Sequence, residues 1–388
     1  MKGKIIINCN SYICDLIARA PAEWEERLLY DYSVKVKREG RLAIFNYTIE
    51  SDFSDPVVQE ARGIIIDTER LFVVCRPFRK FGNYNERYAD SIDWNSARIL
   101  EKVDGSIVKL WYDGLEERWR FSTNSTISAE NAAVDGEEGL TFMALIESAD
   151  NYGDIPFDRL QKDSTYIFEL ASPKNRVIVK YENTTLYHIG TRRNASGEER
   201  DEDIGIRKPR SYEASSLAEC IALAASLNDA CEGDEVEREG FVVVDKDFRR
   251  VKVKSPDYIM MHRLKQTGVL SKRECITMIL DRREKIEGVC RENPDLEHVF
   301  RYYEYKLSEL RYTARRLALF ACRLYEEYSR DRGAVAGVIG KHPLAMVAFR
   351  ALETGESGDD IFDRLPCEKK IKLIPDYEPV DIRRVFGV

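Results

Sequence analysis

The chain has 388 residues, of which 44% are hydrophobic and 33% charged, and its formal net charge is -8 at pH 7. This composition is that of a globular protein and excludes a disordered or fibrous chain, while the length predicts two domains. The acidic balance argues against a protein that coats nucleic acid through bulk attraction, although it leaves room for a local basic groove. Residues 256–388 hold 24 Lys and Arg against 22 Asp and Glu, so the acidity lies in the first 255 residues.

Nine cysteines are scattered singly, without a CxxC pair or the spacing of a zinc knuckle, which predicts reduced thiols in a cytoplasmic protein. The start, MKGKIIINCNSYICDL, places two lysines before an apolar stretch, but Asn8 and Asn10 interrupt that stretch too early for a signal peptide. No run approaches the length of a membrane span. We therefore expect no membrane association.

From about residue 40 to residue 255, short apolar or alternating runs bounded by turn residues predict strands. In chain order they are RLAIFNYTI, ARGIIIDT, LFVVCRPF, SIVKLWYDG, RWRFSTNST, STYIFELA, NRVIVKY, TLYHIGTRR, EGFVVVD and RRVKVKS. Two intervening segments, GLTFMALIESADNY and SLAECIALAASLND, carry apolar residues at helical spacing. The pattern predicts an α+β domain of antiparallel sheets flanked by helices over residues 1–255.

After residue 255 the hydrophobic period becomes helical in RECITMILDRREKIEGVC, HVFRYYEYKLSELRYTARRLALFACRLYEEYSR and HPLAMVAFRALETG. We expect an all-α domain over residues 256–388. The arginine-rich stretch from Arg311 to Arg323 could face RNA, but a charged helix face is more often simply solvated.

The segment EKVDGS places Lys102 two residues before an Asp-Gly turn, formed by Asp104 and Gly105, at the mouth of a strand. A lysine attacks as a nucleophile only after it loses its proton, so such a site needs neighbouring positive charge to lower the lysine pKa. Lys252 and Lys254, assisted by a metal ion, could supply that charge. The alternative is a surface lysine beside a β-turn, because Lys-x-Asp-Gly alone is a weak signal.

A set of companions surrounds this segment in a fixed order along the chain. They are Arg62 in ARG, Lys80 and Phe81 in RKFGNYNE, Glu169 in YIFELASPKNRVIVKY, Glu239 in REGFVVV, and Lys252 with Lys254 in RVKVKSPDY. In this order they resemble the nucleotidyl motifs of the covalent nucleotidyltransferases, a superfamily that contains DNA ligases, RNA ligases and mRNA capping enzymes.

Each companion has a physical role in lysine adenylylation, where charge builds on the α-phosphate as pyrophosphate leaves. Lys252 and Lys254 alternate along a strand, so both side chains point to one face and can clasp phosphate, unless they form a solvated strand edge. The planar guanidinium of Arg62 suits a phosphate or a structural salt bridge. Lys80 could hold the β- and γ-phosphates. Phe81 could lie against the adenine or in the core beneath it, and we favour the core position.

Glu169 and Glu239 suit metal-bound water or ribose hydroxyls, the competing role being an exposed strand carboxylate.

Together, ARGIIID, KFGNYNE, EKVDGS, FELASPKNRVIVKY, EGFVVV and VKVKSPDY resemble the RNA ligase 1 family, best known from the tRNA-repair ligase of T-even phages. The resemblance runs from about Phe45 to His262. Its most specific piece is FELASPKNRVIVKY, because generic DNA ligases and capping enzymes lack this Asn-Arg-x-x-x-x-Tyr continuation.

The resemblance implies a nucleotidyltransferase (ATP-grasp-like ligase) domain that uses ATP as AMP donor with Mg²⁺ or Mn²⁺. Lys102 would become the AMP-lysine, and the other residues of its catalytic set would be Asp104, Gly105, Glu239 and Tyr258. The residues that contact ATP would be Tyr47, Arg62, Lys80, Phe81, Lys252 and Lys254. The metal would be held by Glu169 and Glu239. The alternative role of Tyr258 is packing. The resemblance also implies an acidic residue early in the helical domain, and Glu284 is the nearest candidate.

The clearest departure from the family lies in FSTNSTIS, where a basic residue is usual at about the position of Asn124. In this family the helical domain is associated with tRNA preference. We therefore expect a monomer that seals RNA, with tRNA broken in the anticodon loop as substrate and a polynucleotide kinase-phosphatase as functional partner. The alternatives are a non-catalytic RNA-binding protein that retains the fold, although its motifs should then be broken, and a DNA ligase or capping enzyme, although helices rather than a β-barrel follow Lys254.

Overall fold

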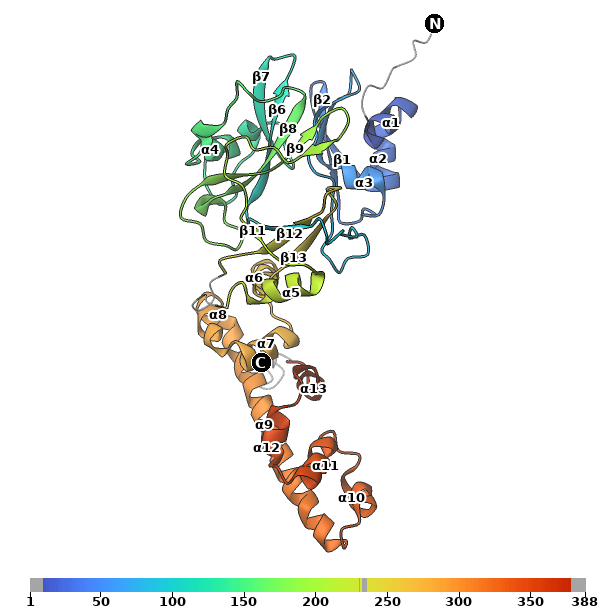
Figure 1. The fold of residues 1–388 in the computed structure, drawn as a ribbon, viewed down its shortest axis with the longest axis vertical. Helices are drawn as coiled ribbons and strands as arrows, with labels where there is room; N and C mark the ends of the chain where they lie inside the picture. The colour runs from blue at the N-terminus through green and yellow to red at the C-terminus, as the bar shows by residue number, and fades with distance from the viewer. Residues whose placement is uncertain (1–9, 230, 232–235, 378–388) are drawn as a thin grey trace, which may run out of the picture. The chain divides into compact units, whose positions relative to one another are not determined.

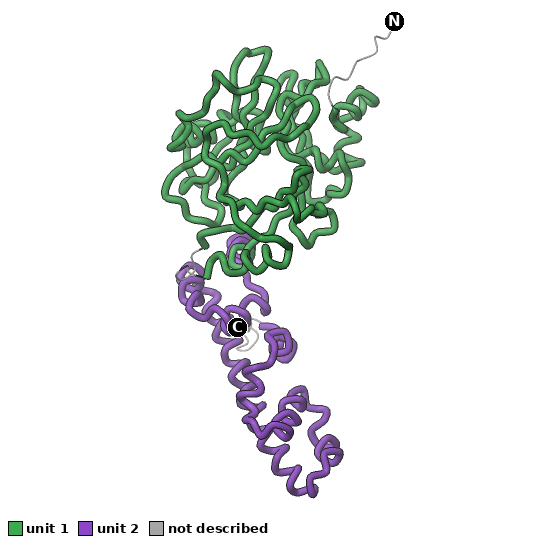
Figure 2. The backbone as a smooth tube through the Cα atoms, in the orientation of Figure 1, with its two compact units in different colours: residues 1–230, 236–259 green, residues 231–235, 260–388 purple. Residues whose placement is uncertain are grey.

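The computed structural model describes residues 10–229, 231 and 236–377, and the chain divides into two compact units. Unit 1 comprises residues 1–230 and 236–259, and unit 2 comprises residues 231–235 and 260–388 (Figure 2). Unit 1 therefore ends at Ile259, a few residues beyond the border expected from the sequence, and includes Tyr258. Residues 1–9, used above to argue against a signal peptide, lie outside the described part.

Three antiparallel sheets form unit 1 (Figure 1). The first has the order β1 (Val34–Glu39), β2 (Leu42–Tyr47), β3 (Arg62–Asp67), β4 (Phe72–Cys75). The second has the order β10 (Glu199–Arg200), β9 (Thr185–Arg193), β8 (Ser164–Ala171), β6 (Ser106–Asp113), β7 (Arg118–Thr123). The third has the order β11 (Ser211–Tyr212), β5 (Arg98–Glu101), β12 (Gly240–Val244), β13 (Arg250–Lys254).

Each sheet buries one face under helices. The helices α1 (Tyr12–Arg19), α2 (Trp24–Tyr32) and α3 (Pro56–Glu60) lie beside the first sheet (Figure 1). They pack with it around one apolar cluster. The helix α4 (Phe142–Glu147) packs in the same way against the second sheet, and α5 (Leu217–Ser226) against the third. Burial of these apolar faces stabilises the layers. The opposite face of the first sheet packs against Trp111, whereas strands of the second and third sheets contribute most of the strand residues that line a cavity.

The strand β8 is buried along its whole length, as expected for a strand covered on both faces. Side chains alternate along it, so Tyr166 and Phe168 enter the cluster beside α4, whereas Ile167 packs with Phe78 and Phe81 on the other face. The same alternation carries Glu169 to the face of Ile167. A carboxylate is thereby built into the wall of the cavity.

One expected strand is wrong. Residues 175–181, NRVIVKY, form no strand; a short 3-10 turn at Pro173–Asn175 is followed by bends. The backbone N–H groups of Ile178 and Val179 donate to the carboxylate of Asp104 instead of to a neighbouring strand. Ile178 and Val179 are nevertheless buried, which explains why the apolar pattern of the segment is that of a strand.

The described part of unit 2 consists of helices without a strand (Figure 1). After α6 (Pro256–Thr267), which crosses the border of the units, come α7 (Lys272–Asp281), α8 (Ile286–Glu292), α9 (Glu297–Glu327), α10 (Arg332–Ile339), α11 (Ala345–Thr354), α12 (Gly358–Asp363) and α13 (Cys367–Leu373). The segment RECITMILDRREKIEGVC forms two helices rather than one, because α7 ends at Asp281 and a 3-10 turn precedes α8. The expected α+β class with a helical C-terminal part is confirmed. Across the described residues, none of the helices combines the length and apolarity that a membrane crossing requires.

Candidate active site

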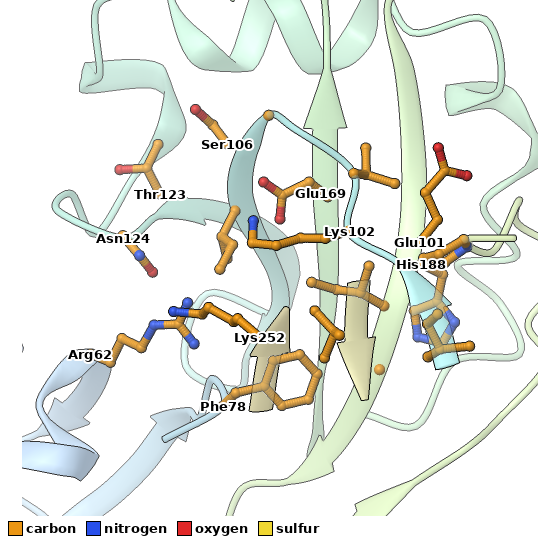
Figure 3. A pocket seen from close by; sticks show the side chains of 18 of the residues that line it. Arg62, Phe78, Glu101, Lys102, Ser106, Thr123, Asn124, Glu169, His188 and Lys252 are labelled. Atoms are coloured by element: carbon orange, nitrogen blue, oxygen red, sulfur yellow. The ribbon is translucent and has the colours of Figure 1, made fainter. Parts of the chain in front are cut away.

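Lys102 stands between β5 and β6, at the edge of a cavity of about 970 Å³ that is lined entirely by residues of unit 1. Its backbone N–H donates to the carbonyl of Gly240 at 2.8 Å, which fixes the connection against β12. Its side chain is 20% exposed and points into the cavity beside Glu169 (Figure 3). The amine is therefore accessible yet largely removed from water.

Asp104 and Gly105 shape the turn that follows the lysine. One carboxylate oxygen of Asp104 accepts a hydrogen bond from the Tyr258 hydroxyl at 2.6 Å, and the other accepts two from the backbone N–H groups of Ile178 and Val179, at 2.8 Å each. A Cβ at position 105 would lie 2.3 Å from a backbone carbonyl oxygen of β8, so only glycine fits there. These residues organise the backbone around Lys102.

Glu239 joins two lysines of the site. Its Oε2 lies 2.6 Å from Nζ of Lys102 and its Oε1 lies 2.8 Å from Nζ of Lys254, while the side chain itself is buried. The second ammonium also lies over the ring of Tyr258, at 4.9 Å from its centroid. Burial, followed by the carboxylates of Glu239 and Asp104, raises the pKa of that tyrosine, which stays a hydrogen-bond donor.

The expectation that positive neighbours would lower the pKa of Lys102 is wrong for the free protein. Burial acts in the expected direction, but the carboxylates of Glu239 and Glu169 outweigh it and raise the pKa of the Lys102 amine. The depressed group is instead Lys252, whose pKa falls to about 7 because of burial and then the charges of Arg62 and other cations nearby. The charged groups with the largest effects on the Lys102 amine are the carboxylates of Glu239, Glu169 and Asp104.

Cations and aromatic rings alternate along another side of the cavity. Phe81 lies between two of them, with the guanidinium of Arg62 at 5.2 Å and Nζ of Lys252 at 4.8 Å from its ring centroid. The ring packs with Phe78 and Ile167 and is buried, which is the core position favoured from the sequence. Such cation–π contacts hold closely spaced positive groups in place. A polyanion is the ligand that this array fits.

Lys80 and Tyr47 belong to the same array, although they are not among the residues that line the cavity. Nζ of Lys80 lies 4.9 Å from the ring centroid of Tyr47 and 4.7 Å from that of Phe53. The Tyr47 hydroxyl in turn is hydrogen-bonded to Arg62. Tyr47 thus contacts a residue that lines the cavity, and Lys80 packs on Tyr47.

Glu169 fits a divalent cation. It lines the cavity at 8% exposure and forms no hydrogen bond or ion pair within the described part of the chain. Burial raises the pKa of its carboxyl to about 7; Lys102 opposes this rise and Glu239 adds to it. A buried carboxylate without a partner is suited to a hydrated Mg²⁺ or Mn²⁺, whose other ligands are water and substrate phosphates.

Glu239 is a poorer candidate for the metal, because a lysine occupies each of its oxygens. Among residues 10–229, 231 and 236–377, no group of three His, Cys, Asp or Glu side chains forms a ready-made metal site. A cation held by Glu169 alone would therefore depend on the substrate for its remaining ligands.

Arg250 was missed by the sequence reasoning. It shares one face of β13 with Lys252 and Lys254 and lines the same cavity. Its guanidinium lies 4.2 Å from the ring centroid of Phe78 and pairs with Glu199 at 2.5 Å, so its charge is balanced within the protein. The alternation in RRVKVK could have identified it.

Asn124 and Glu284, both noted in the sequence, fall in different places. Asn124 lines the cavity, and its buried Oδ1 has no hydrogen-bond partner in the structure, so the departure noted in the sequence does lie in the site. Glu284 is exposed on the 3-10 turn Arg283–Lys285 of unit 2 and is not among the lining residues.

A largely buried lysine and an array of cations share this cavity, an arrangement suited to binding a phosphorylated ligand. Residues 60–258, just over half of the chain, match the family described as RNA ligase. The protein belongs to the RNA ligase family.

Two relatives illustrate the match. A protein of Autographa californica nuclear polyhedrosis virus, named as a bifunctional polynucleotide kinase/RNA ligase, is 32% identical over 258 residues, covering 60% of this chain and 35% of the relative. An RNA ligase of Rhodothermus phage RM378 is 27% identical over 302 residues, covering 60% of this chain and 67% of the relative. The chain thus spans about a third of the first relative and two thirds of the second.

Solved structures show only distant likeness. An archaeal ATP-dependent RNA ligase aligns with a TM-score of 0.44 and 14% identity, covering 88% of this chain and 83% of the other. Naegleria gruberi RNA ligase with PPi aligns with a TM-score of 0.31 and 13% identity, covering 43% and 52%. Scores of this size add nothing to the assignment.

Proposed function

We propose that this protein is an ATP-dependent RNA ligase that joins a 5′-phosphate to a 3′-hydroxyl through an AMP carried on Lys102. The observation that carries the proposal is the placement of the Lys102 amine in one cavity with the unpartnered carboxylate of Glu169 and the cation array of Arg62 and Lys252. A nucleophile, an acid for a metal and a cradle for phosphates are what lysine adenylylation requires.

In the first step, Nζ of Lys102 attacks the α-phosphorus of ATP, a P–N bond forms, and the bond to pyrophosphate breaks. The amine must first lose a proton, and Oε2 of Glu239 at 2.6 Å is the acceptor within reach. Arg62, Lys252 and Lys254 stabilise the charge that develops on the phosphates. A divalent cation at Glu169 would act as a Lewis acid on the same oxygens.

In the second step, a 5′-phosphate oxygen of RNA attacks the phosphorus of lysyl-AMP, and the amine of Lys102 leaves. In the third, an RNA 3′-hydroxyl attacks the activated 5′-phosphate, forms the phosphodiester and releases AMP. The substrate that we propose is tRNA cleaved in its anticodon loop, with a polynucleotide kinase-phosphatase preparing the ends and the protein acting as a monomer.

The test has two stages. Incubation with ATP labelled at the α-phosphate should leave label on the protein after denaturation, and Lys102→Ala should remain unlabelled. Sealing is then compared on tRNA nicked in the anticodon loop, linear single-stranded RNA and nicked duplex DNA. Sealing of DNA in preference to both RNAs would refute the substrate class, and absence of label would favour a non-catalytic RNA-binding protein.

A further inference from the structure

Lys109 is a lysine whose side chain is fully buried on β6. Its neighbours across the sheet, Ser122 on β7 and Ile167 on β8, are buried as well. An ammonium in such surroundings is costly unless a partner stabilises it. Within the described residues it has no carboxylate partner, and the acceptor it does have is the backbone carbonyl oxygen of Gly63, 2.5 Å from Nζ.

Gly63 is the extra residue of a β-bulge. In the pairing of β2 with β3, Phe45 lies opposite Ile64 and Asn46 lies opposite Arg62, so Gly63 has no partner on β2. Its φ of +81° is a conformation that favours glycine, and a Cβ there would lie 2.6 Å from the backbone oxygen of Asn124. Lys109 therefore replaces the missing partner strand as hydrogen-bond donor to this carbonyl.

The bulge decides where Arg62 points. Ile64 faces the apolar cluster under α1, α2 and α3. A regular strand would send the side chain two residues earlier to that same face, because side chains alternate. The inserted residue reverses the alternation, and Arg62 lines the cavity instead, with its guanidinium over Phe81.

We propose that Lys109 is a positioning residue for Arg62, holding the bulge at Gly63 so that the guanidinium faces the triphosphate. Lys109 is not among the residues that line the cavity, so it acts through Arg62 rather than on the substrate. The pKa of Lys109 is lowered to about 8, mainly by burial; the Cys75 thiol opposes this change and the nearby charge of Arg62 contributes to it. The inference rests on the proposed function only in taking ATP as the ligand of Arg62.

Lys109→Met tests this, because methionine has similar length and no charge. The ATP concentration for half-maximal labelling of Lys102 should rise about tenfold, the worth of one charge-assisted hydrogen bond to phosphate. The maximal labelling rate should change less. In an Arg62→Ala background the same change should have no further effect on ATP dependence, since the group that it positions is gone.

Ser122→Ala is the matched control. Ser122 is buried opposite Lys109 and contacts Cys75, with 3.9 Å between its Oγ and the sulfur, but it does not hold Gly63. It should leave ATP dependence unchanged. A wild-type ATP dependence in Lys109→Met, or an effect that adds fully to that of Arg62→Ala, would overturn the proposal.

Two further outcomes are decisive. If Lys109→Met does not fold, Lys109→Gln, which keeps a neutral donor, takes its place; if neither variant folds, Lys109 serves the core and the proposal is wrong. If the wild type takes no label, the proposed function fails, and ATP affinities measured by calorimetry replace the labelling data for every variant. A wild type that binds no ATP would overturn both proposals.

Discussion

At the scale of single residues, the two oxygens of Glu239 decide which cations are paired in the free protein. Each holds one lysine, Lys102 or Lys254, and the pKa of Lys102 is raised, so its amine is an ammonium in the free protein. The proton that must leave therefore already faces its acceptor. In the proposed reaction, activation would be a redistribution of charge around Glu239 rather than a permanently low pKa of Lys102.

Lys102→Ala should abolish covalent labelling by ATP, because no other amine replaces it between β5 and β6. Lys102→Arg should be equally inactive, since a guanidinium stays protonated and cannot attack. Labelled protein is counted after denaturation and gel separation. Label on either variant at the wild-type rate would show that the nucleophile lies elsewhere.

Lys252 should take up a proton when a triphosphate binds. Its pKa of about 7 leaves much of it neutral in the free protein at pH 8, and nearby phosphate favours the charged form and raises that pKa. Calorimetry with an ATP analogue that cannot release pyrophosphate, in two buffers of different ionisation enthalpy, measures the uptake. Lys252→Arg should abolish this uptake, because arginine is already charged in the free state; an unchanged value would assign the proton to another group.

Glu169 should make metal dependence sensitive to pH. Its carboxyl, with a pKa of about 7, must lose a proton to bind a cation, so metal affinity rises as pH increases from 6 to 8. The half-saturating magnesium concentration for labelling should fall several-fold over that range, by about tenfold per unit well below the pKa. In Glu169→Gln the half-saturating magnesium concentration should be higher and should not change with pH. Glu169→Ala should give the same result and should keep the fold. A wild-type magnesium profile in both variants would remove Glu169 from the site.

At the scale of elements, alternation along strands explains what could be predicted. The period of two in RVKVKS places Lys252 and Lys254 on one face, and the structure has them lining one cavity. The same period fails for Arg62, which a bulge at Gly63 turns to the opposite face. Bulges have no signature in a pattern of apolar residues, so the position of Arg62 depended on tertiary structure.

The segment 175–181 illustrates a second limit. Its apolar run is typical of a strand, but its backbone donors are satisfied by a carboxylate more than seventy residues earlier in the chain, Asp104. Burial can be predicted from composition, whereas the hydrogen-bonding partner cannot. Likewise β5, the short strand that ends next to Lys102, carries too few residues for a periodic signal.

Asp104→Asn should weaken the link between this segment and the lysine turn. Asparagine keeps one oxygen that can accept from the N–H groups of Ile178 and Val179, but its NH₂ group then faces the Tyr258 hydroxyl, which must accept instead of donate. The carboxylate charge that strengthens all three hydrogen bonds is lost, which costs about 1–3 kcal/mol. Tyr258→Phe, which deletes one hydrogen bond to the same carboxylate, should cost about 1 kcal/mol. Urea unfolding of both single variants and the double variant measures these values. Because the residues share one bond at 2.6 Å, the two losses should not add; additive losses would mean that the bond does not form.

At the scale of the whole molecule, the border between the units bears on how chemistry and substrate choice are divided. All residues that line the cavity precede Ser255. Tyr258, whose hydroxyl donates to Asp104, also belongs to unit 1, but it lies three residues after the domain border that the sequence predicted at residue 255. A chain ending at residue 255 therefore loses a contact of the site. A chain ending at residue 267 keeps it, together with the whole of α6.

We predict that residues 1–267 label Lys102 at close to the full-length rate, whereas residues 1–255 label more slowly because the Asp104 carboxylate lacks its Tyr258 donor. The 1–267 piece also carries Met260→Gln and Leu264→Gln, because these side chains pack in the core of unit 2 and would otherwise be exposed. The 1–255 piece ends before both positions. Full-length Tyr258→Phe is the matched control, and its labelling rate should resemble that of residues 1–255 more than that of residues 1–267.

If the helical unit selects RNA, both pieces should also lose any preference for nicked tRNA over linear RNA, measured as the ratio of the two sealing rates. A folded 1–267 piece that retains the full-length ratio would place RNA selection within unit 1, and equal labelling by the two pieces would remove Tyr258 from the site.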